Sequence, residues 1–283
     1  MNRAKLFFEL TKPGIIYGNA LNATAGFFLA SSGNPVWQIF IAVLTGLSCI
    51  IACACVLNNY FDRDIDALMI RTKSRGIVRG EVTRAQAFVF AGILGTLGTA
   101  ILAIYINLLT LALALLGLFI YVCLYTPAKR VTPWSTEIGS FAGAIPALVG
   151  YTAVTNVVDI PGALLFLLIM FWQMPHFFAI SIYRLEDYRA AKIPVLSVAK
   201  NTLRAKIAAL IYLFLFTATV FLLEYYAHIG PIYIAVMGTA SILWLVLGIY
   251  GFFAQAEKRW ARKMFFYSLL VVLLLSGTLI FHR

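Results

Sequence analysis

Long apolar runs without a charged side chain recur along the sequence. A helix of about 20 apolar residues is long enough to cross the hydrocarbon core of a bilayer. Because that core offers no water to unpaired backbone groups, such runs can span it as helices, which satisfy their own hydrogen bonds. The chain is 62% hydrophobic and 12% charged, whereas soluble domains carry about 25% charged residues. We therefore predict an all-α membrane protein with several transmembrane helices.

Nine of these runs are predicted to form transmembrane helices in one bundle. They lie at about residues 14–30, 36–58, 85–104, 108–126, 138–155, 162–183, 205–225, 232–253 and 264–281. No clear cleavage site follows the first run, so we expect it to be retained as a helix. We expect residues 1–283 to form a single domain.

The basic residues indicate how the helices are oriented. All of the 22 Lys and Arg residues except Arg283 fall in the N-terminal segment or in the loops after the second, fourth, sixth and eighth predicted helices. The positive-inside rule makes this side cytoplasmic, so we predict a cytoplasmic N-terminus and a C-terminus outside. The net charge of +11 is then explained by membrane orientation and anionic lipid rather than by binding to nucleic acid.

A polar stretch after the second predicted helix, residues 58–66, holds Asp62, Asp64 and Asp66, which are three of the chain's 11 acidic residues. If the helix continues, Asn58, Asp62 and Asp66 recur every four residues and face one side along about 12 Å. Such oxygen ligands suit Mg²⁺, which completes its shell with water and substrate phosphates. The pattern predicts an intramembrane enzyme that handles a diphosphate. The alternative is a helix end whose carboxylates face water and offset nearby arginines.

The loop after the sixth predicted helix has a similar order of residues. Glu186 and Asp187 are followed there by Arg189 and Lys192, as the aspartates of the earlier loop are followed by the basic residues of 71–75. This order indicates a weak internal repeat of four helices, and binding sites often lie where such repeats meet. We predict that the carboxylates of both loops hold Mg²⁺ and that basic side chains bind the diphosphate. Each basic residue alone can also be explained as a charge of a cytoplasmic loop.

The spacing of Asn58, Asp62 and Asp66 resembles the first aspartate-rich motif of the UbiA-type intramembrane prenyltransferases. Further segments, in the right order over nearly the whole chain, resemble the branch of that family that farnesylates haem. These segments are Thr11-Lys12-Pro13-Gly14, residues 58–66 with 71–75, Tyr125-Thr126 with Lys129-Arg130, Trp172-Gln173-Met174-Pro175-His176, and Asp187-Tyr188 with Ile193-Pro194-Val195-Leu196. The last two segments are the ones that point to the haem branch.

The resemblance implies a bundle of nine helices around a central cavity, with Mg²⁺ as cofactor and with farnesyl diphosphate and haem B (protohaem IX) as substrates. The reaction it implies joins farnesyl to a haem vinyl group and gives haem O. The implied metal ligands are Asn58, Asp62, Asp66 and Asp187, of which the three aspartates are the catalytic residues. The implied diphosphate-binding residues are Lys73, Arg75, Lys129, Arg130 and Lys192.

The resemblance also implies where the enzyme acts. At one position, however, the chain departs from the pattern of the wider family. The active site is expected on the cytoplasmic side of a bacterial-type inner membrane, with a haem carrier or a terminal oxidase as a further partner. The wider family has a second aspartate four residues before Asp187, where this chain has Tyr183. Glu186 is the residue we consider as its replacement.

His176 lies near the middle of the sixth predicted helix, next to Pro175. Proline interrupts the local hydrogen-bond ladder, and an ionisable side chain inside a span is a candidate for function. Since imidazole is a common axial ligand of haem iron, we predict that His176 binds haem. The alternative is a packing histidine that donates to a backbone carbonyl.

Three other functions fit parts of the sequence. A UbiA-type enzyme could act on an aromatic quinone precursor with the same metal site. A secondary transporter could also have repeats and buried polar residues, but broken helices at the bilayer midplane are typical of transporters, whereas these aspartates lie at one edge. Phosphatidyl alcohol transferases need an Asp-Gly-x-x-Ala-Arg element, and Asp66-Ala67-Leu68 does not supply it.

Overall fold

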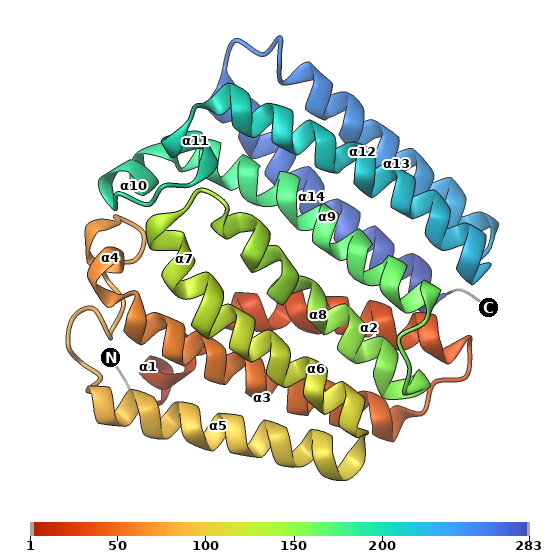
Figure 1. Cartoon of the computed structure of the whole chain (residues 1–283), viewed down its shortest axis with the longest axis horizontal. Helices are drawn as coiled ribbons and strands as arrows, with labels where there is room; N and C mark the ends of the chain where they lie inside the picture. Colours follow the sequence, from red (N-terminus) through yellow and green to blue (C-terminus); the bar gives the residue numbers. More distant parts are fainter. Residues whose placement is uncertain (1–2, 282–283) are drawn as a thin grey trace.

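The protein folds as a bundle of helices in a computed structural model that describes residues 3–281 (Figure 1). In these residues the elements are helical throughout, and no strand forms. They are α1 (Arg3–Leu10), α2 (Pro13–Ser31), α3 (Trp37–Phe61), α4 (Arg63–Leu68), α5 (Arg84–Tyr105), α6 (Leu108–Phe119), η1 (Ile120–Tyr125), α7 (Thr126–Val131), α8 (Ser135–Thr155), α9 (Ile160–Tyr183), α10 (Leu185–Ala190), α11 (Leu196–Ala199), α12 (Thr202–Ala227), α13 (Pro231–Tyr250) and α14 (Glu257–Ile280).

The long helices correspond to the predicted spans. Eight segments within residues 3–281 are long and apolar enough to cross a membrane, and one of them joins α6, η1 and α7 into a 24-residue span, Leu108–Val131. The remaining predicted span is α2, a helix of 19 residues whose hydropathy is lowered by Asn19 and Asn22. It packs in the same bundle against α3, α8 and α14. The prediction of an all-α membrane protein is confirmed.

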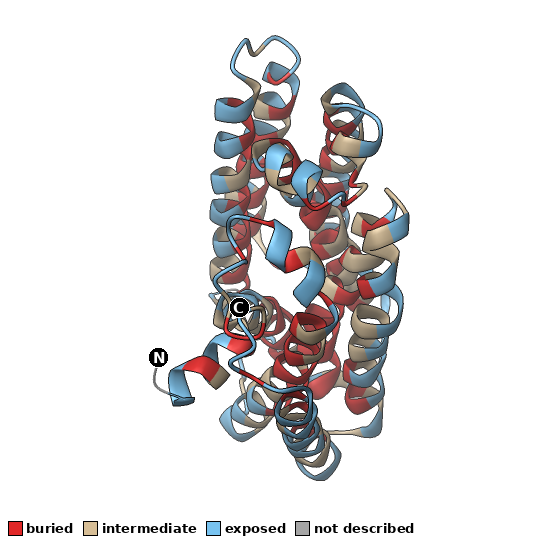
Figure 2. Ribbon diagram, turned by 90° about the vertical axis from the view of Figure 1, so that its left-hand side faces the viewer, coloured by how far each residue is buried: buried red, intermediate tan, exposed pale blue. Residues whose placement is uncertain are grey.

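The long helices lie side by side, and the two ends of the chain are at opposite ends of the bundle (Figure 1). Buried residues gather inside the bundle, while exposed residues cover the outward faces (Figure 2). Many of these exposed residues are large and apolar, for example Ile93, Leu108 and Leu273. Such a surface suits contact with lipid chains rather than with water.

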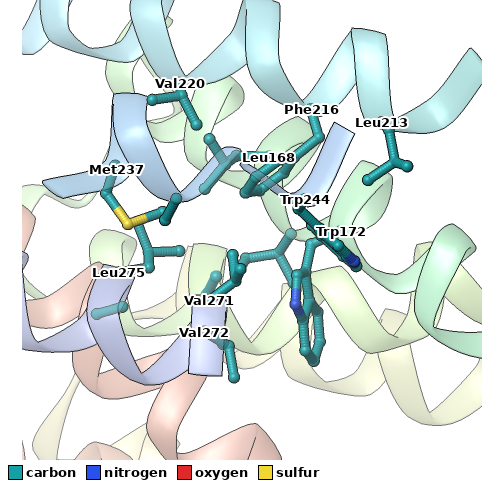
Figure 3. Packing of buried hydrophobic residues seen from close by; sticks show 14 of the residues in the cluster. Leu168, Trp172, Leu213, Phe216, Val220, Met237, Trp244, Val271, Val272 and Leu275 are labelled. Carbon is teal, nitrogen blue, oxygen red and sulfur yellow. The ribbon is translucent and has the colours of Figure 1, made fainter. Parts of the chain in front are cut away.

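The largest buried cluster joins α9, α12, α13 and α14. Figure 3 shows Trp172, Phe216 and Trp244 meeting in it from three of these helices, and all three side chains are buried. The indole Nε1 of Trp172 donates to the backbone oxygen of Ser268 at 2.8 Å. Since lipid is as apolar as these side chains, close packing rather than removal from water holds such helices together.

α2 and α8 approach each other more closely than side chains would allow. A Cβ atom added to Gly26 would lie 1.9 Å from the carbonyl oxygen of Ala147, and one added to Gly150 would lie 1.9 Å from that of Ala23. Small residues at a helix interface allow this approach in membranes. The contact holds α2, which begins directly after Lys12, against α8.

The start of α14 differs from the prediction. We expected the last span to begin at residue 264, with the preceding basic residues in a loop, but the helix begins at Glu257. Trp260, Ala261 and Met264 are buried at helical spacing, which extends the apolar face by two turns. Lys and Arg side chains between them can extend to the membrane surface, so they do not end the helix.

We predict that Gly26→Ala lowers the stability of the bundle. The added methyl group would overlap the Ala147 carbonyl, and overpacking of this kind costs about 1–3 kcal/mol. The midpoint of thermal unfolding in detergent measures the effect. Gly18→Ala is the matched control in the same helix, because its Cβ would meet nothing within 4 Å. Equal midpoints for the two variants would contradict the role assigned to the close approach.

Candidate active site

Asn58, Asp62 and Asp66, the three residues predicted to bind metal, do not lie on one continuous helix. α3 ends at Phe61, and Asp62 links it to α4 with φ −92° and ψ 0°. The condition that one helix continues through the stretch is therefore not met at this residue. The spacing survives the break, because the Asp62 N–H donates to the Asn58 carbonyl at 2.9 Å and the Asp66 N–H donates to the Asp62 carbonyl at 2.8 Å.

The burial of these side chains tests one part of the alternative interpretation, in which the carboxylates face water. Asn58, Asp62 and Asp66 are only 2%, 2% and 6% exposed. Asp64 instead faces solvent, with 62% of its side chain exposed. Its pKa is lowered to about 2, chiefly by the hydrogen bond from Arg130. The predicted metal ligands are thus not carboxylates that merely face water.

Three of the predicted diphosphate-binding residues form ion pairs with the aspartates of this motif. Lys129 pairs with Asp62, and Arg75 lies 2.5 Å from Asp66. Arg130 reaches both oxygens of Asp64 at 2.7 Å and lies 3.9 Å from Asp62. The structure therefore brings α3, α4, α7 and the loop before α5 together through ion pairs. Pairing is needed here, because an unpaired charge in a buried site is strongly unfavourable.

Lys12 is a site residue that the sequence interpretation missed. It lies between α1 and α2 in a left-handed conformation, with φ 52°, and its Nζ donates to the Asn58 Oδ1 at 2.5 Å. Burial lowers the pKa of Lys12 to about 8, and the nearby charges of Arg75 and Lys129 act in the same direction. The signal in the sequence is the Lys-Pro-Gly segment, which by itself indicates only a family resemblance and a cytoplasmic charge.

A π-helical turn, η1, supplies a second contact that was not foreseen. The Thr126 hydroxyl accepts from the Asn58 Nδ2 at 2.9 Å and donates to the Tyr121 carbonyl at 2.9 Å. Pro127 follows this turn, and a proline ring inside a helix disfavours the usual backbone bond to the residue four positions earlier. Turns of this kind are frequent at functional sites. Together with Lys12, Thr126 fixes the orientation of the Asn58 amide.

Asn59, next in sequence, ties the site to the N-terminal helix. Its Nδ2 donates to the Leu10 carbonyl at 2.8 Å, and its Oδ1 accepts from Arg75 at 3.0 Å. Arg75 therefore bridges Asn59 and Asp66. The adjoining loop is held as well, since the Thr72 hydroxyl donates to the Asp66 carbonyl at 2.9 Å.

The second predicted loop lies against the first, as expected. Met69 of the first loop is buried in a cluster with Ala191, Ile193 and Val195 of the second, and α4 and α10 lie at the same end of the bundle (Figure 1). Packing between these apolar side chains holds the two polar loops together.

The charged residues of the second loop differ in how far they are exposed and in their ion-pair partners. Asp187 is half-buried and lies 3.8 Å from Arg184, and no hydrogen bond or ion pair joins it to Asp62 or Asp66 in residues 3–281. Glu186 is 84% exposed and pairs with Arg189, so the expectation that it replaces a second aspartate is not supported. Two further residues predicted to bind diphosphate have exposed side chains, Lys73 and Lys192.

His176 lies between α9 and α14, with its ring stacked on Trp172 at 5.2 Å and packed against Phe265 at 5.0 Å. Its Nδ1 is 2.7 Å from the Ser268 hydroxyl oxygen, which itself donates to the Phe265 carbonyl. With the serine proton used there, Ser268 can accept only from the tautomer of His176 that carries its proton on Nδ1. The ring's partner is a serine and not a backbone carbonyl, and in that tautomer Nε2 carries the lone pair.

The residues present fit a hard divalent cation. Asp62 Oδ1 is buried and has no hydrogen-bond partner in the described part of the chain, and oxygen atoms of Asn58 and Asp66 complete a donor set that suits Mg²⁺. No group of three or more His, Cys, Asp or Glu side chains within residues 3–281 could hold a metal by itself. A cation here would therefore depend on the Asn58 amide, on water and on substrate phosphates.

Comparison with known proteins agrees with this fold. A sequence model of the UbiA prenyltransferase family matches residues 19–270, and the chain belongs to that family. It is 45% identical to the protoheme IX farnesyltransferase of Protochlamydia amoebophila (strain UWE25), over 97% of each chain. It is 42% identical to protoheme IX farnesyltransferase 2 of Pseudomonas putida (strain W619), over 96% of this chain and 92% of that one. The resemblance found in the sequence is confirmed.

Two solved structures share the fold. One is a digeranylgeranylglyceryl phosphate synthase, with a TM-score of 0.82 and 20% identity over 99% of both chains. The other is a UbiA homolog from Archaeoglobus fulgidus bound to GPP and Mg²⁺, with a TM-score of 0.74 and 18% identity over 97% of this chain and 99% of that chain. At such identities the likeness establishes the shared fold.

We predict that Thr126→Val destabilises the site. The change keeps the shape of the side chain but leaves the buried Asn58 amide without an acceptor, which costs about 1–3 kcal/mol. Thermal unfolding in detergent measures the loss, with Thr96→Val as control because Thr96 is exposed on α5. Unfolding of both variants at the wild-type temperature would show that Thr126 does not support Asn58.

Proposed function

We propose that this protein transfers a farnesyl group from farnesyl diphosphate to a vinyl group of haem B and so forms haem O. The observation that carries the proposal is the 45% identity, over 97% of the chain, to a protoheme IX farnesyltransferase. The buried cluster of Asn58, Asp62 and Asp66 supports it, because a diphosphate needs metal and cationic partners at a site shielded from water.

We further propose that Asn58, Asp62 and Asp66 hold Mg²⁺, with Asp187 contributing from the second loop. When bound, Mg²⁺ would neutralise charge on the diphosphate and stabilise it as a leaving group. The ammonium groups of Lys12 and Lys129 already lie within the site, so they can bind phosphate oxygens after small rotations of their side chains. Arg75 and Arg130 border the same space, and the exposed Lys73 and Lys192 would act at its mouth.

The chain must protect the farnesyl cation that forms when the allylic C–O bond breaks. The site lies at the end of an apolar helix, where water is largely excluded. Tyr121 and Tyr125 lie beside it with ring centroids 5.3 Å apart, and the Lys129 ammonium is 5.8 Å from the Tyr125 ring. Aromatic faces attract cations, so these rings can stabilise the farnesyl cation after diphosphate takes the bonding electron pair.

The acceptor step needs no strong base in the protein. The haem vinyl group is an electron-rich alkene, and its π electrons form the new carbon–carbon bond to the farnesyl cation. Positive charge then rests on the carbon next to the porphyrin, where water adds and loses a proton to leave a hydroxyl group. The balance is one farnesyl diphosphate, one haem B and one water giving haem O, diphosphate and a proton.

We propose that His176 contacts the haem. In the tautomer that donates Nδ1–H to Ser268, the Nε2 lone pair would be free for the iron, as ligation through Nε2 requires. Trp172 supports the arrangement, because it stacks on the His176 ring and donates to the Ser268 backbone.

The membrane setting follows from the charge distribution. Both site loops and the N-terminal segment carry most of the basic residues, so we propose that the site lies at the cytoplasmic surface of a bacterial-type inner membrane. The whole chain, residues 1–283, would act as one domain. A haem carrier or terminal oxidase as partner stays a prediction.

The test of the function is a reaction of the detergent-purified protein with haem B, farnesyl diphosphate and Mg²⁺, followed by mass spectrometry. We expect haem O from the wild type and about 100-fold less or lower from Asp62→Asn, since that variant removes a charge that would bind the metal. Asp187→Asn should also lose activity, whereas Glu186→Gln, with its exposed side chain, should react at nearly the wild-type rate.

Other products would overturn the proposal. If the protein does not convert haem but prenylates a hydroxybenzoate, the acceptor is a quinone precursor. Absence of farnesyl diphosphate binding, with counterflow of a solute in liposomes, would favour a transporter. Equal activity of Asp62→Asn and the wild type would remove the metal site from the mechanism.

For the haem contact, we predict that His176→Ala weakens haem binding and shifts the Soret band. Ser268→Ala keeps the imidazole but removes the hydroxyl that contacts its Nδ1. We expect this variant to lower haem affinity about tenfold or more, as loss of such a supporting hydrogen bond does at metal sites. Absorbance titration of the purified protein with haem B measures both. His228→Ala is the control, because His228 lies beyond the end of α12. An unchanged spectrum and affinity for His176→Ala would exclude iron ligation.

A further inference from the structure

A groove on the outer face of the bundle, between α13 and α14, lies apart from the active-site network. Its volume is about 590 Å³, and its lining includes three basic residues, Arg259, Arg262 and Lys263, together with Leu247, Phe266 and Leu270. The basic end lies near the end of α9, because the Arg262 guanidinium is 6.0 Å from the Tyr183 ring. The groove therefore opens at the end of the bundle that also carries α10.

The basic end of this groove has more positive charge than its surroundings neutralise. Arg259, Arg262 and Lys263 are exposed, and in residues 3–281 none of them forms an ion pair. The acidic residue near them, Glu257, already forms an ion pair with Lys206, with 2.5 Å between Oε1 and Nζ. Cations in the first turns of a helix also oppose the helix dipole. An anion bound here would relieve both kinds of repulsion.

The rest of the groove suits a hydrocarbon chain. Arg262, Phe266 and Leu270 recur every four residues along α14, so the charged end continues into an apolar face over about 12 Å. Phe266 and Leu270 are 54% and 46% exposed. A second groove of about 470 Å³, lined by residues such as Cys53, Gly92 and Leu118, contains no charged residue. Charge at one end thus distinguishes the α13–α14 groove from an ordinary lipid-facing depression.

We propose that the α13–α14 groove is a binding site for an anionic phospholipid. The lipid phosphate is held by Arg259, Arg262 and Lys263, and an acyl chain lies along Leu247, Phe266 and Leu270. This site is separate from the diphosphate site and does not depend on the proposed reaction. It would anchor the start of α14, the helix that supplies Ser268 to His176.

The test uses the full-length protein in detergent, with phosphatidylglycerol and phosphatidylcholine of identical acyl chains as probes and native mass spectrometry to count the bound lipid. The wild type should bind phosphatidylglycerol more tightly. The triple variant Arg259→Gln, Arg262→Gln, Lys263→Gln should lose about tenfold or more of that preference, because each basic residue near a membrane surface contributes about fivefold in binding. Lys258→Gln is the matched control, since Lys258 is exposed in the same helix turn but does not line the groove.

Several outcomes would overturn the site. Equal binding of the two lipids by the wild type, or an unchanged preference in the triple variant, would exclude recognition by these three cations. A preference lost equally in Lys258→Gln would show only a general effect of positive charge. Displacement of phosphatidylglycerol by glycerol 3-phosphate at equal concentration would exclude a role for the acyl chain. The triple variant alters exposed side chains, and its unfolding temperature without added lipid shows whether it is folded.

Discussion

The structure depends on two buried carboxylates at the end of an apolar helix. Asp62 and Asp66 are shielded from water, and burying a carboxylate charge is strongly unfavourable without close cationic partners. Those partners come from separate parts of the chain, namely Lys129 from α7 and Arg75 from the loop before α5. The need to pair these charges therefore determines how the segments at this end of the bundle approach one another.

Irregular backbone is concentrated around the same carboxylates. Lys12 is left-handed, the helix is interrupted at Asp62, and a π-helical turn precedes Thr126. Non-helical backbone near membrane depth is tolerated where protein surrounds it. Two of these irregularities lie beside side chains that contact Asn58, namely Lys12 and Thr126, so departures from ideal helices gather where the site is built.

Much of the fold could be predicted because its signals are local. Uncharged apolar runs mark the long helices, and the four-residue spacing marks Asn58, Asp62 and Asp66 even though the helix breaks between them. The start of α14 differs from the prediction because a run of charges indicates a helix end in the sequence, whereas burial of Trp260 extends the helix through it.

The missed features of the site depend on contacts between distant segments. Lys12 looked like one more cytoplasmic charge, and only its contact with Asn58, 46 positions away, reveals a different role. The same holds for Thr126, which is an ordinary helix residue until Asn58 donates to it. Glu186 and Asp187 are neighbours in sequence, and packing of the loop after α9 exposes one while it half-buries the other.

Lys12 donates to Asn58 and Lys129 pairs with Asp62, so ammonium groups occupy oxygens of the proposed metal site. If a metal diphosphate binds there as proposed, these oxygens would exchange an ammonium group for the metal, and the ammonium groups would turn to phosphate. No unpaired charge would then arise in the low-dielectric interior, and release of diphosphate would return each lysine to its oxygen.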